Sequence, residues 1–212
     1  VAGAVLMARH AAGLRAVVEL RRARVDDSER FGAHTTWRVG AGTPLGRTTR
    51  VLGAIGTAFR EPQYIEELLA GGAAPVDGLI AEQSRTWQAG VEQSFVQRRL
   101  VLSATYFHQT FVHMVSFVGV PGAGGFQNAD HASANGWELG IRADLSDALR
   151  VSSSATILDA RFDGTGPNTG GHLLRRPSLH GNAGVVWQAN RNFSLCTDVT
   201  YVGRRSENQI YT

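Results

Sequence analysis

The stretch NGWELGIRADLS, residues 135–146, decides the fold because its apolar and polar residues alternate strictly. In a β-strand, successive side chains point to opposite faces of the sheet, whereas a helix would mix the two sets around its circumference. One parity is polar or glycine throughout. The other parity is apolar and holds Trp137, Leu139, Ile141, Ala143 and Leu145. The stretch therefore predicts a strand with one apolar and one wet face.

The same period of two recurs along the chain. It is clear in Ser84–Val96, Pro177–Ala189 and Phe193–Gly203. Weaker versions occupy Leu14–Val25, Thr35–Thr43, Arg50–Phe59, Leu100–Val118 and Leu149–Phe162. Together these segments predict about nine strands, each close to the ~9–11 residues with which a tilted strand crosses a bilayer.

The connections between these strands alternate between short and long. The short connections are Leu45–Arg47, Gln97–Arg98, Ser146–Ala148 and Asn190–Asn192. The long connections are Asp26–His34, Arg60–Gln83, Gly119–Ser133 and Gly164–Leu174. Tight turns at one end and long loops at the other are typical of outer-membrane barrels. We therefore expect an all-β fold, an antiparallel up-and-down meander that forms part of a transmembrane β-barrel.

Composition excludes several other classes. The net charge is only +3 and the 21 basic residues, all Arg, are scattered, which argues against nucleic-acid binding. A single cysteine, Cys196, excludes an internal disulfide. No apolar run reaches the ~18 residues of a spanning helix, and a closed barrel is the other way to cross a membrane. The first residue is Val1, and we expect that the chain was cut from something longer.

Aromatic residues on the apolar parity support the membrane interpretation. They lie toward the predicted strand ends, where they would form the interfacial girdles of a barrel. These residues are Trp37, Trp87, Trp137, Phe95, Phe193 and Tyr201.

Motifs for catalysis or for metal binding are not found. The glycines at 122, 124 and 125 lack the Gly-Lys-Ser/Thr of a phosphate-binding loop. The histidines, among them His108, His113, His131 and His172, have no Cys or carboxylate partner at ligand spacing. The acidic group at Asp26, Asp27 and Glu29 lacks the spacing of a calcium loop. We therefore expect no catalytic residue, no metal and no cofactor.

Two motifs in the first half resemble the barrel of TonB-dependent outer-membrane receptors. Residues 56–69 contain GTAFREP followed by Glu67-Leu68-Leu69, similar to the family's Gly-x-x-Phe-Arg-x-Pro and Glu-Leu-Tyr pattern, with Leu69 in place of Tyr. Leu79, Glu82 and Ser84, followed by the strand from Trp87, resemble a second family motif. Ala81 replaces its usual Pro, and Gln88 stands where Glu is frequent.

Three later motifs follow in the family's order. They are FQN at 126–128 with ANGWE at 134–138, LLRRP at 173–177, and YVGRR at 201–205. The resemblance extends from Leu14 to the C-terminus. We expect residues 1–212 to be one domain, a part of such a barrel that lacks the family's plug domain, its TonB-contact segment and the final strands.

The resemblance implies energised uptake of a scarce ligand, such as a siderophore or cobalamin, by a receptor in the outer membrane that is not an enzyme. The implied partners are outer-membrane lipid, a small-molecule ligand such as an iron–siderophore, and the TonB complex through the absent plug. For ligand contact we select residues of the long loops: Tyr64, Glu66, Asp77, Phe126, Asn128 and His131.

The remaining motif residues are assigned to barrel architecture. They are Phe59, Arg60, Pro62, Glu82, Gly136, Glu138, Arg175, Arg176 and Pro177. The charged residues Arg38, Glu92, Glu138 and Arg142 are expected to line the lumen or touch the plug, because charge on the lipid face is costly. Two alternatives remain: a passive porin-like channel or adhesin barrel, and a soluble β-sandwich binding module.

Overall fold

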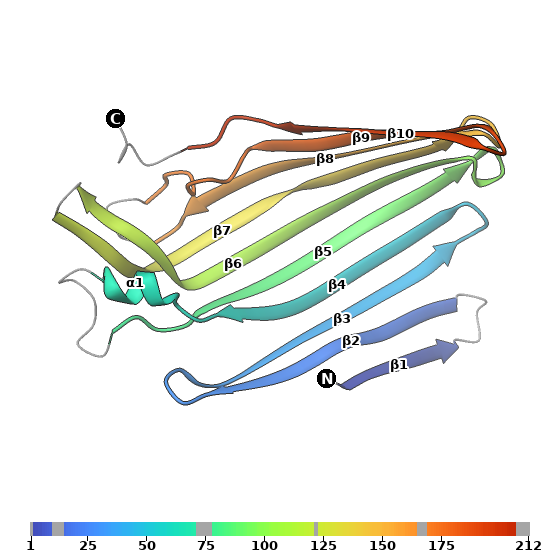
Figure 1. The fold of residues 1–212 in the computed structure, drawn as a ribbon. Helices are drawn as coiled ribbons and strands as arrows, with labels where there is room; N and C mark the ends of the chain where they lie inside the picture. Colours follow the sequence, from blue (N-terminus) through green and yellow to red (C-terminus); the bar gives the residue numbers. More distant parts are fainter. Residues whose placement is uncertain (1, 10–14, 71–77, 121–122, 165–168, 207–212) are drawn as a thin grey trace.

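The predicted meander is confirmed by the computed structural model, which describes residues 2–9, 15–70, 78–120, 123–164 and 169–206. These residues form one antiparallel sheet of ten strands, in which each strand pairs with its neighbours in sequence (Figure 1). The strands are β1 Ala2–Arg9, β2 Arg15–Ser28, β3 Gly32–Leu45, β4 Thr49–Arg60, β5 Glu82–Phe95, β6 Leu100–Val120, β7 Ala123–Asp144, β8 Leu149–Phe162, β9 Leu179–Asn190 and β10 Phe193–Val202. Two short helical segments, α1 Tyr64–Leu68 and η1 Val96–Arg98, lie between strands.

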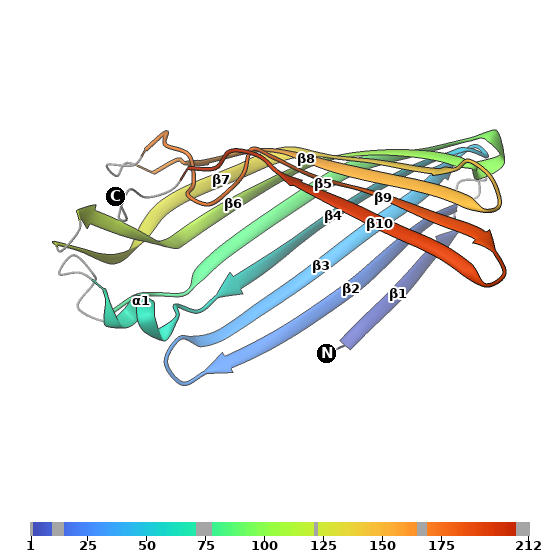
Figure 2. The same ribbon diagram turned by 45° about the horizontal axis from the view of Figure 1, so that its top comes forward.

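The turns predicted to be short are short, and they lie at one end of the sheet, on the right in Figure 1. The connection that contains α1 and the one between β8 and β9 are long, as predicted, and lie at the opposite end. We call these the turn end and the loop end. Figure 2 shows that the sheet is curved between its edge strands β1 and β10.

The structure corrects the sequence interpretation at three places. The apolar N-terminal segment forms β1, which was not predicted. Asp26–His34 is not a long loop, because β2 and β3 pair as far as Ser28 and Gly32. Gly119–Ser133 is not a loop either, because β6 and β7 pair as far as Val120 and Ala123. That hairpin is rich in glycine, which is depleted in strands. The cross-strand pair of Phe117 and Phe126, whose ring centroids are 5.5 Å apart, stabilises it.

Strand register aligns residues into rows across the sheet, and each row is uniform in character. One row is almost entirely apolar: Gly53, Ala89, Tyr106, Trp137, Ile157 and Leu179. A row of the other parity carries the polar groups: Arg50, Glu92, Ser103, Gly140, Ser154, Asn182 and Thr200. The sheet therefore has an apolar face and a polar face over most of its width.

Exposure shows that the sheet curves around its polar face. On the apolar parity of β5, Trp87 and Val91 are 43% and 42% exposed. On the polar parity of the same strand, Gln88 and Glu92 are half-buried, because side chains on a concave surface crowd one another. A contiguous apolar surface of this extent is a liability in water but suits lipid.

The apolar face carries a continuous uncharged band. From the row of Trp137 to the row of Trp187, no described residue on this face is Asp, Glu, Arg or His. Trp137 of β7 and Leu145, which follows β7, are eight residues apart, a separation of about 27 Å along a strand and about 20 Å across a bilayer at a ~40° tilt. This height is close to the ~25 Å apolar band of outer-membrane barrels.

Aromatic side chains mark both margins of the band. Tyr106 lies between Trp87 and Trp137, with ring centroids 5.4 and 5.3 Å away, at the margin nearer the loop end. Phe95 and Phe193 lie at the turn-end margin. Two of the residues predicted to form the girdles do not lie at a margin of the band. Tyr201 aligns with Leu139 inside the band, and Trp37 lies beyond the band on the loop side.

Adjacent serines on β8 provide a matched test of the two faces. Ser153 aligns with Ile141 on the apolar face, and Ser154 aligns with Gly140 on the polar face. Ser153→Arg places a guanidinium near the middle of the band, at a cost of about 2–4 kcal/mol, so the fraction of heat-modifiable barrel in outer membranes should fall sharply. Ser154→Arg adds the same side chain to the polar face and should assemble nearly normally. Equal assembly of the two variants would contradict the assignment.

Candidate functional site

Both long connections fold inward at the loop end and cover part of the polar face. Leu173 of the β8–β9 loop is 2% exposed and packs with Ala132, Ala160 and Phe162 of the strands. In the β4–β5 loop, Leu79 is also only 2% exposed. The β8–β9 loop therefore has a small hydrophobic core against the sheet, which fixes its position over the concave side.

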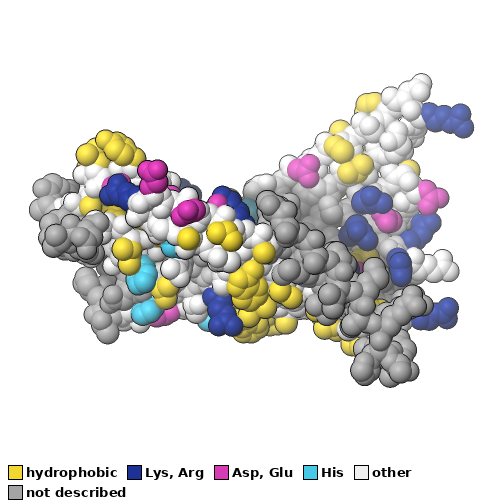
Figure 3. Space-filling model, turned by 90° about the horizontal axis from the view of Figure 1, so that it is seen from below, with side chains coloured by type: hydrophobic (Ala, Val, Ile, Leu, Met, Phe, Trp, Pro, Cys, Tyr) yellow, Lys and Arg dark blue, Asp and Glu magenta, His cyan; other side chains and the backbone are white. Residues whose placement is uncertain are grey.

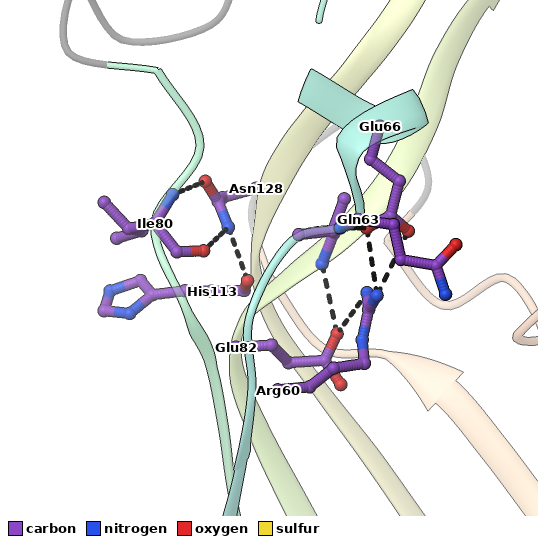
Figure 4. A network of polar contacts seen from close by, with 8 residues as sticks. Arg60, Gln63, Glu66, Ile80, Glu82, His113 and Asn128 are labelled. Atoms are coloured by element: carbon purple, nitrogen blue, oxygen red, sulfur yellow. Dashed lines mark hydrogen bonds and ion pairs between the residues drawn. The ribbon is translucent and has the colours of Figure 1, made fainter. Parts of the chain in front are cut away.

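A partly buried ion-pair network anchors α1 to the sheet (Figure 4). Arg60, at the end of β4, pairs with Glu66 of α1 at 2.9 Å and with Glu82 of β5 at 3.2 Å. Glu66 also accepts a hydrogen bond from the Gln63 backbone N–H at 2.7 Å, and Glu82 accepts one from the Val115 N–H at 3.3 Å. One arginine thus joins the helix, two strands and the start of the loop.

The charge state of Arg60 follows from these contacts, which lie at the loop end, beyond the uncharged band. Burial lowers the pKa of the Arg60 guanidinium, but hydrogen bonds and charge attraction from Glu66 and Glu82 outweigh burial and raise it above its usual value. Arg60 therefore stays charged and attracts both carboxylates, and its single positive charge offsets one of their two negative charges.

Asn128 of β7 holds the segment before β5 in place. Its amide nitrogen donates to the carbonyl oxygens of Ile80 at 3.0 Å and His113 at 2.6 Å, and its Oδ1 accepts from the Ile80 N–H at 3.0 Å (Figure 4). His113 has a φ of 55°, a left-handed conformation that is uncommon without glycine. The side-chain amide therefore satisfies backbone groups that the sheet ladder does not reach.

Two motifs that are distant in sequence meet beside β9. The Ser178 N–H donates to the Arg204 carbonyl at 3.3 Å, and the Arg175 N–H donates to the Ser206 carbonyl at 2.8 Å. The LLRRP and YVGRR segments thus continue the β9–β10 contact beyond the strands.

The sheet also carries two hollows. One of about 420 Å³ lies between the β2–β3 hairpin and β4–β6, and its lining includes His34, Phe59 and Arg85. The other, of about 550 Å³, lies at the turn end, and its lining includes Arg50, Glu92 and Arg142. Sequence reasoning placed Glu92 and Arg142 toward the lumen but gave no role to Arg50, because only the strand register brings it beside Glu92.

Comparison with known proteins agrees with this geometry. The family model described as "TonB dependent receptor-like, beta-barrel" matches residues 12–211. The chain belongs to the TonB-dependent receptor family. Its place is therefore the outer membrane, where the uncharged band faces lipid. Among the described residues, no helix is long and apolar enough to cross a membrane.

The individual relatives described next share 25% sequence identity or less with this chain. The iron-regulated outer membrane virulence protein of Vibrio cholerae is 25% identical over 210 residues, which are 87% of this chain and 31% of that protein. The crystal structure of the ferric enterobactin receptor of Pseudomonas aeruginosa matches with a TM-score of 0.68 at 21% identity, covering 92% of this chain and 31% of that one. The siderophore receptor PirA of Pseudomonas aeruginosa gives 0.62 at 21% identity, covering 89% and 40%. The chain spans about a third of the length of the curated relatives it matches.

With the family known, the residues selected for ligand contact can be placed in the receptor barrel. Tyr64 on α1 is 78% exposed and His131 is exposed on β7. Glu66 and Asn128 are held by the contacts above, and Phe126 packs on Phe117. Asp77 lies outside the described residues. The C-terminal end of α1 is joined to β7 by the hydrogen bond from the Phe126 N–H to the Leu69 carbonyl at 2.9 Å.

The residues assigned to architecture lie at junctions of the barrel. Phe59 stacks on His34 with centroids 4.5 Å apart, and Pro62 is buried beside α1. A Cβ on Gly136 would come within 2.1 Å of the Ile157 carbonyl oxygen, so only glycine fits there. Glu138 shares a row with Thr105 and Thr156 on the polar face. Arg175, Arg176 and Pro177 belong to the segment that continues toward β9.

Removal of Arg60 tests whether the network fixes α1. Arg60→Ala leaves the carboxylates of Glu66 and Glu82 without their cation, at a cost of about 1–3 kcal/mol. We expect faster amide exchange at Val115 and faster proteolysis within 61–81, with the barrel still assembled. Arg85→Ala is the control, because the Arg85 side chain makes no hydrogen bond or ion pair with the described residues. Identical protection in the two variants would contradict an anchoring role.

Proposed function

We propose that the protein is an outer-membrane receptor that takes up an iron–siderophore chelate in a TonB-dependent manner and catalyses no reaction. Membership of the receptor family supports the transport role. The siderophore class is supported by the printed roles of the relatives, one named as iron-regulated and two as siderophore or ferric enterobactin receptors. These relatives favour a siderophore over cobalamin.

The observation that carries the proposal is the combination of a polar concave wall with loops that fold inward at one end only. The wall exposes charged and hydroxyl groups such as Glu138 and Ser154 to an aqueous lumen, while lipid covers the other face. At the loop end, α1 presents Tyr64, whose side chain is 78% exposed. An exposed aromatic side chain with few rotatable bonds supplies contact area for a ligand at low cost in conformational entropy.

The uptake proposal is tested in a strain without other siderophore receptors. The full-length protein should confer saturable uptake of radiolabelled iron from at least one ferric siderophore, and deletion of TonB should abolish that uptake. Uptake that persists without TonB would instead favour the passive channel. Absence of uptake and of binding for a broad siderophore panel would overturn the siderophore assignment.

Tyr64 is the residue at which ligand contact is tested most simply. Tyr64→Ala should raise the KM for uptake about tenfold with little change in maximal rate, a loss of about 1.4 kcal/mol of binding. Leu145→Ala is the matched control, because Leu145 is 63% exposed but lies at the turn end. An unchanged KM in Tyr64→Ala, or an equal change in both variants, would exclude Tyr64 from the ligand site.

A further inference from the structure

The hollow of about 420 Å³ at the loop end lies where two neighbouring strands separate. The β3–β4 ladder ends at Arg38 and Gly56, and beyond this pair β3 stays with β2 while β4 stays with β5. At the narrow end of the gap, the Trp37 N–H donates to the Thr57 hydroxyl at 3.3 Å in place of a ladder bond. The hollow is therefore a wedge between β3 and β4, and it extends over β5 and β6.

The wedge has contacts on both sides that hold its shape. His34 of β3 stacks on Phe59 of β4 with ring centroids 4.5 Å apart. Arg30, in the turn of the β2–β3 hairpin, pairs with Glu67 of α1. The hairpin is thus tied to the segment that follows β4, although the backbone ladder between the two strands has ended.

The strand residues that line the wedge lie on the outer face of the sheet. Thr57, Arg85 and Thr110 of the lining align in one row across β4, β5 and β6. This row has the parity of Trp87 and Tyr106, which belong to the apolar face. A plug or a cargo inside the barrel lies on the opposite side of the sheet, so neither one reaches these side chains.

The height of Arg85 places it at the level of lipid headgroups. It is two residues beyond Trp87 and four beyond Ala89, which aligns with Tyr106 and Trp137 at the margin of the band. These separations correspond to about 5 Å and about 10 Å across a bilayer at a ~40° tilt. A headgroup layer is about 5–8 Å thick on each side of the hydrocarbon. The long loops are extracellular in such barrels, so this layer belongs to the extracellular leaflet.

The charge of the wedge is positive and is not balanced within the fold. The lining contains no Asp or Glu, and the exposed Arg85 side chain has no hydrogen bond or ion pair with another described residue. Arg161, which reaches the same height on β8, pairs instead with Asp159 at 2.8 Å. Figure 3 shows the loop end, on the left, where histidine, arginine and hydrophobic side chains lie beside one another.

The lining suits an amphiphile with a phosphate group. A guanidinium presents a planar fork of N–H groups that matches phosphate geometry, and the hydroxyls of Thr35, Thr57 and Thr110 supply further donors. Trp37 and Phe59 add aromatic surface beside these donors. The volume is within the ~300–1,000 Å³ of small-molecule sites, and tryptophan is enriched at headgroup level. This explains why Trp37 lies beyond the apolar band.

We propose that this outer-face wedge binds the phosphate-bearing headgroup of an anionic lipid from the extracellular leaflet. Arg85 holds the phosphate, and the lipid joins β3 to β4 and β5 where the β3–β4 ladder has ended. The site is separate from the lumen, so it does not depend on which cargo the receptor carries.

Native mass spectrometry tests the site in the full-length protein, purified from outer membranes in detergent, stripped of lipid and titrated with lipid A. The wild type should bind phosphorylated lipid A, and dephosphorylated lipid A should bind at least about tenfold more weakly. Arg85→Gln should weaken binding of the phosphorylated lipid by a similar factor. Because the variant lacks the guanidinium, it should no longer distinguish the two lipids.

Arg38→Gln is the matched control. Arg38 aligns with Gly56 and Thr86, one row from Arg85, but on the lumen face, so its removal should leave lipid binding unchanged. Absence of lipid binding by the wild type would overturn the proposal. So would equal binding of the phosphorylated lipid by Arg85→Gln and the wild type, or an equal loss in Arg38→Gln. Inorganic phosphate that binds as tightly as the lipid would show a site for soluble anions and would also overturn it.

Discussion

Backbone hydrogen bonding in a medium without water is the constraint on which the rest of this structure depends. In hydrocarbon, each unpaired N–H or C=O costs several kcal/mol, so a chain that crosses as strands must pair every one of them with a neighbour. The uninterrupted ladders from β3 to β9 meet this requirement across the uncharged band. Once the strands are paired, successive side chains point alternately to lipid and to the lumen.

The two faces of the sheet therefore have different roles. The lipid face needs an uncharged band with aromatic residues at its margins. Within the band, one apolar residue can replace another. The polar face holds the ion pairs of Arg60 and the hydrogen bonds of Asn128 described above. At the loop end, Arg60 and Asn128 fix segments that fold inward. At the turn end, Arg50, Glu92 and Arg142 line a hollow of about 550 Å³.

Much of the fold could be predicted from sequence because alternation is a local signal. Trp137, Leu139 and Ile141 alone indicate the strand, its apolar face and the direction of that face. Loop boundaries were harder to predict, since pairing of Phe117 with Phe126 depends on a cross-strand contact that glycine-rich composition conceals. The candidate sites were the least predictable part. Glu66 resembled a free loop carboxylate until the fold placed it beside Arg60, and Arg50 and Arg98 converge only through strand register and turn geometry.

The central claim, that odd-numbered residues of β7 face lipid and even-numbered residues face the lumen, is tested most directly by cysteine scanning. Single cysteines are placed at Glu138, Leu139, Ile141 and Arg142 in a Cys196→Ser background, and a membrane-impermeant maleimide is applied to intact outer membranes. The account predicts labelling at 138 and 142 and protection at 139 and 141, a period of two along one strand. Uniform labelling of all four positions, or labelling of 139 and 141 alone, would contradict it.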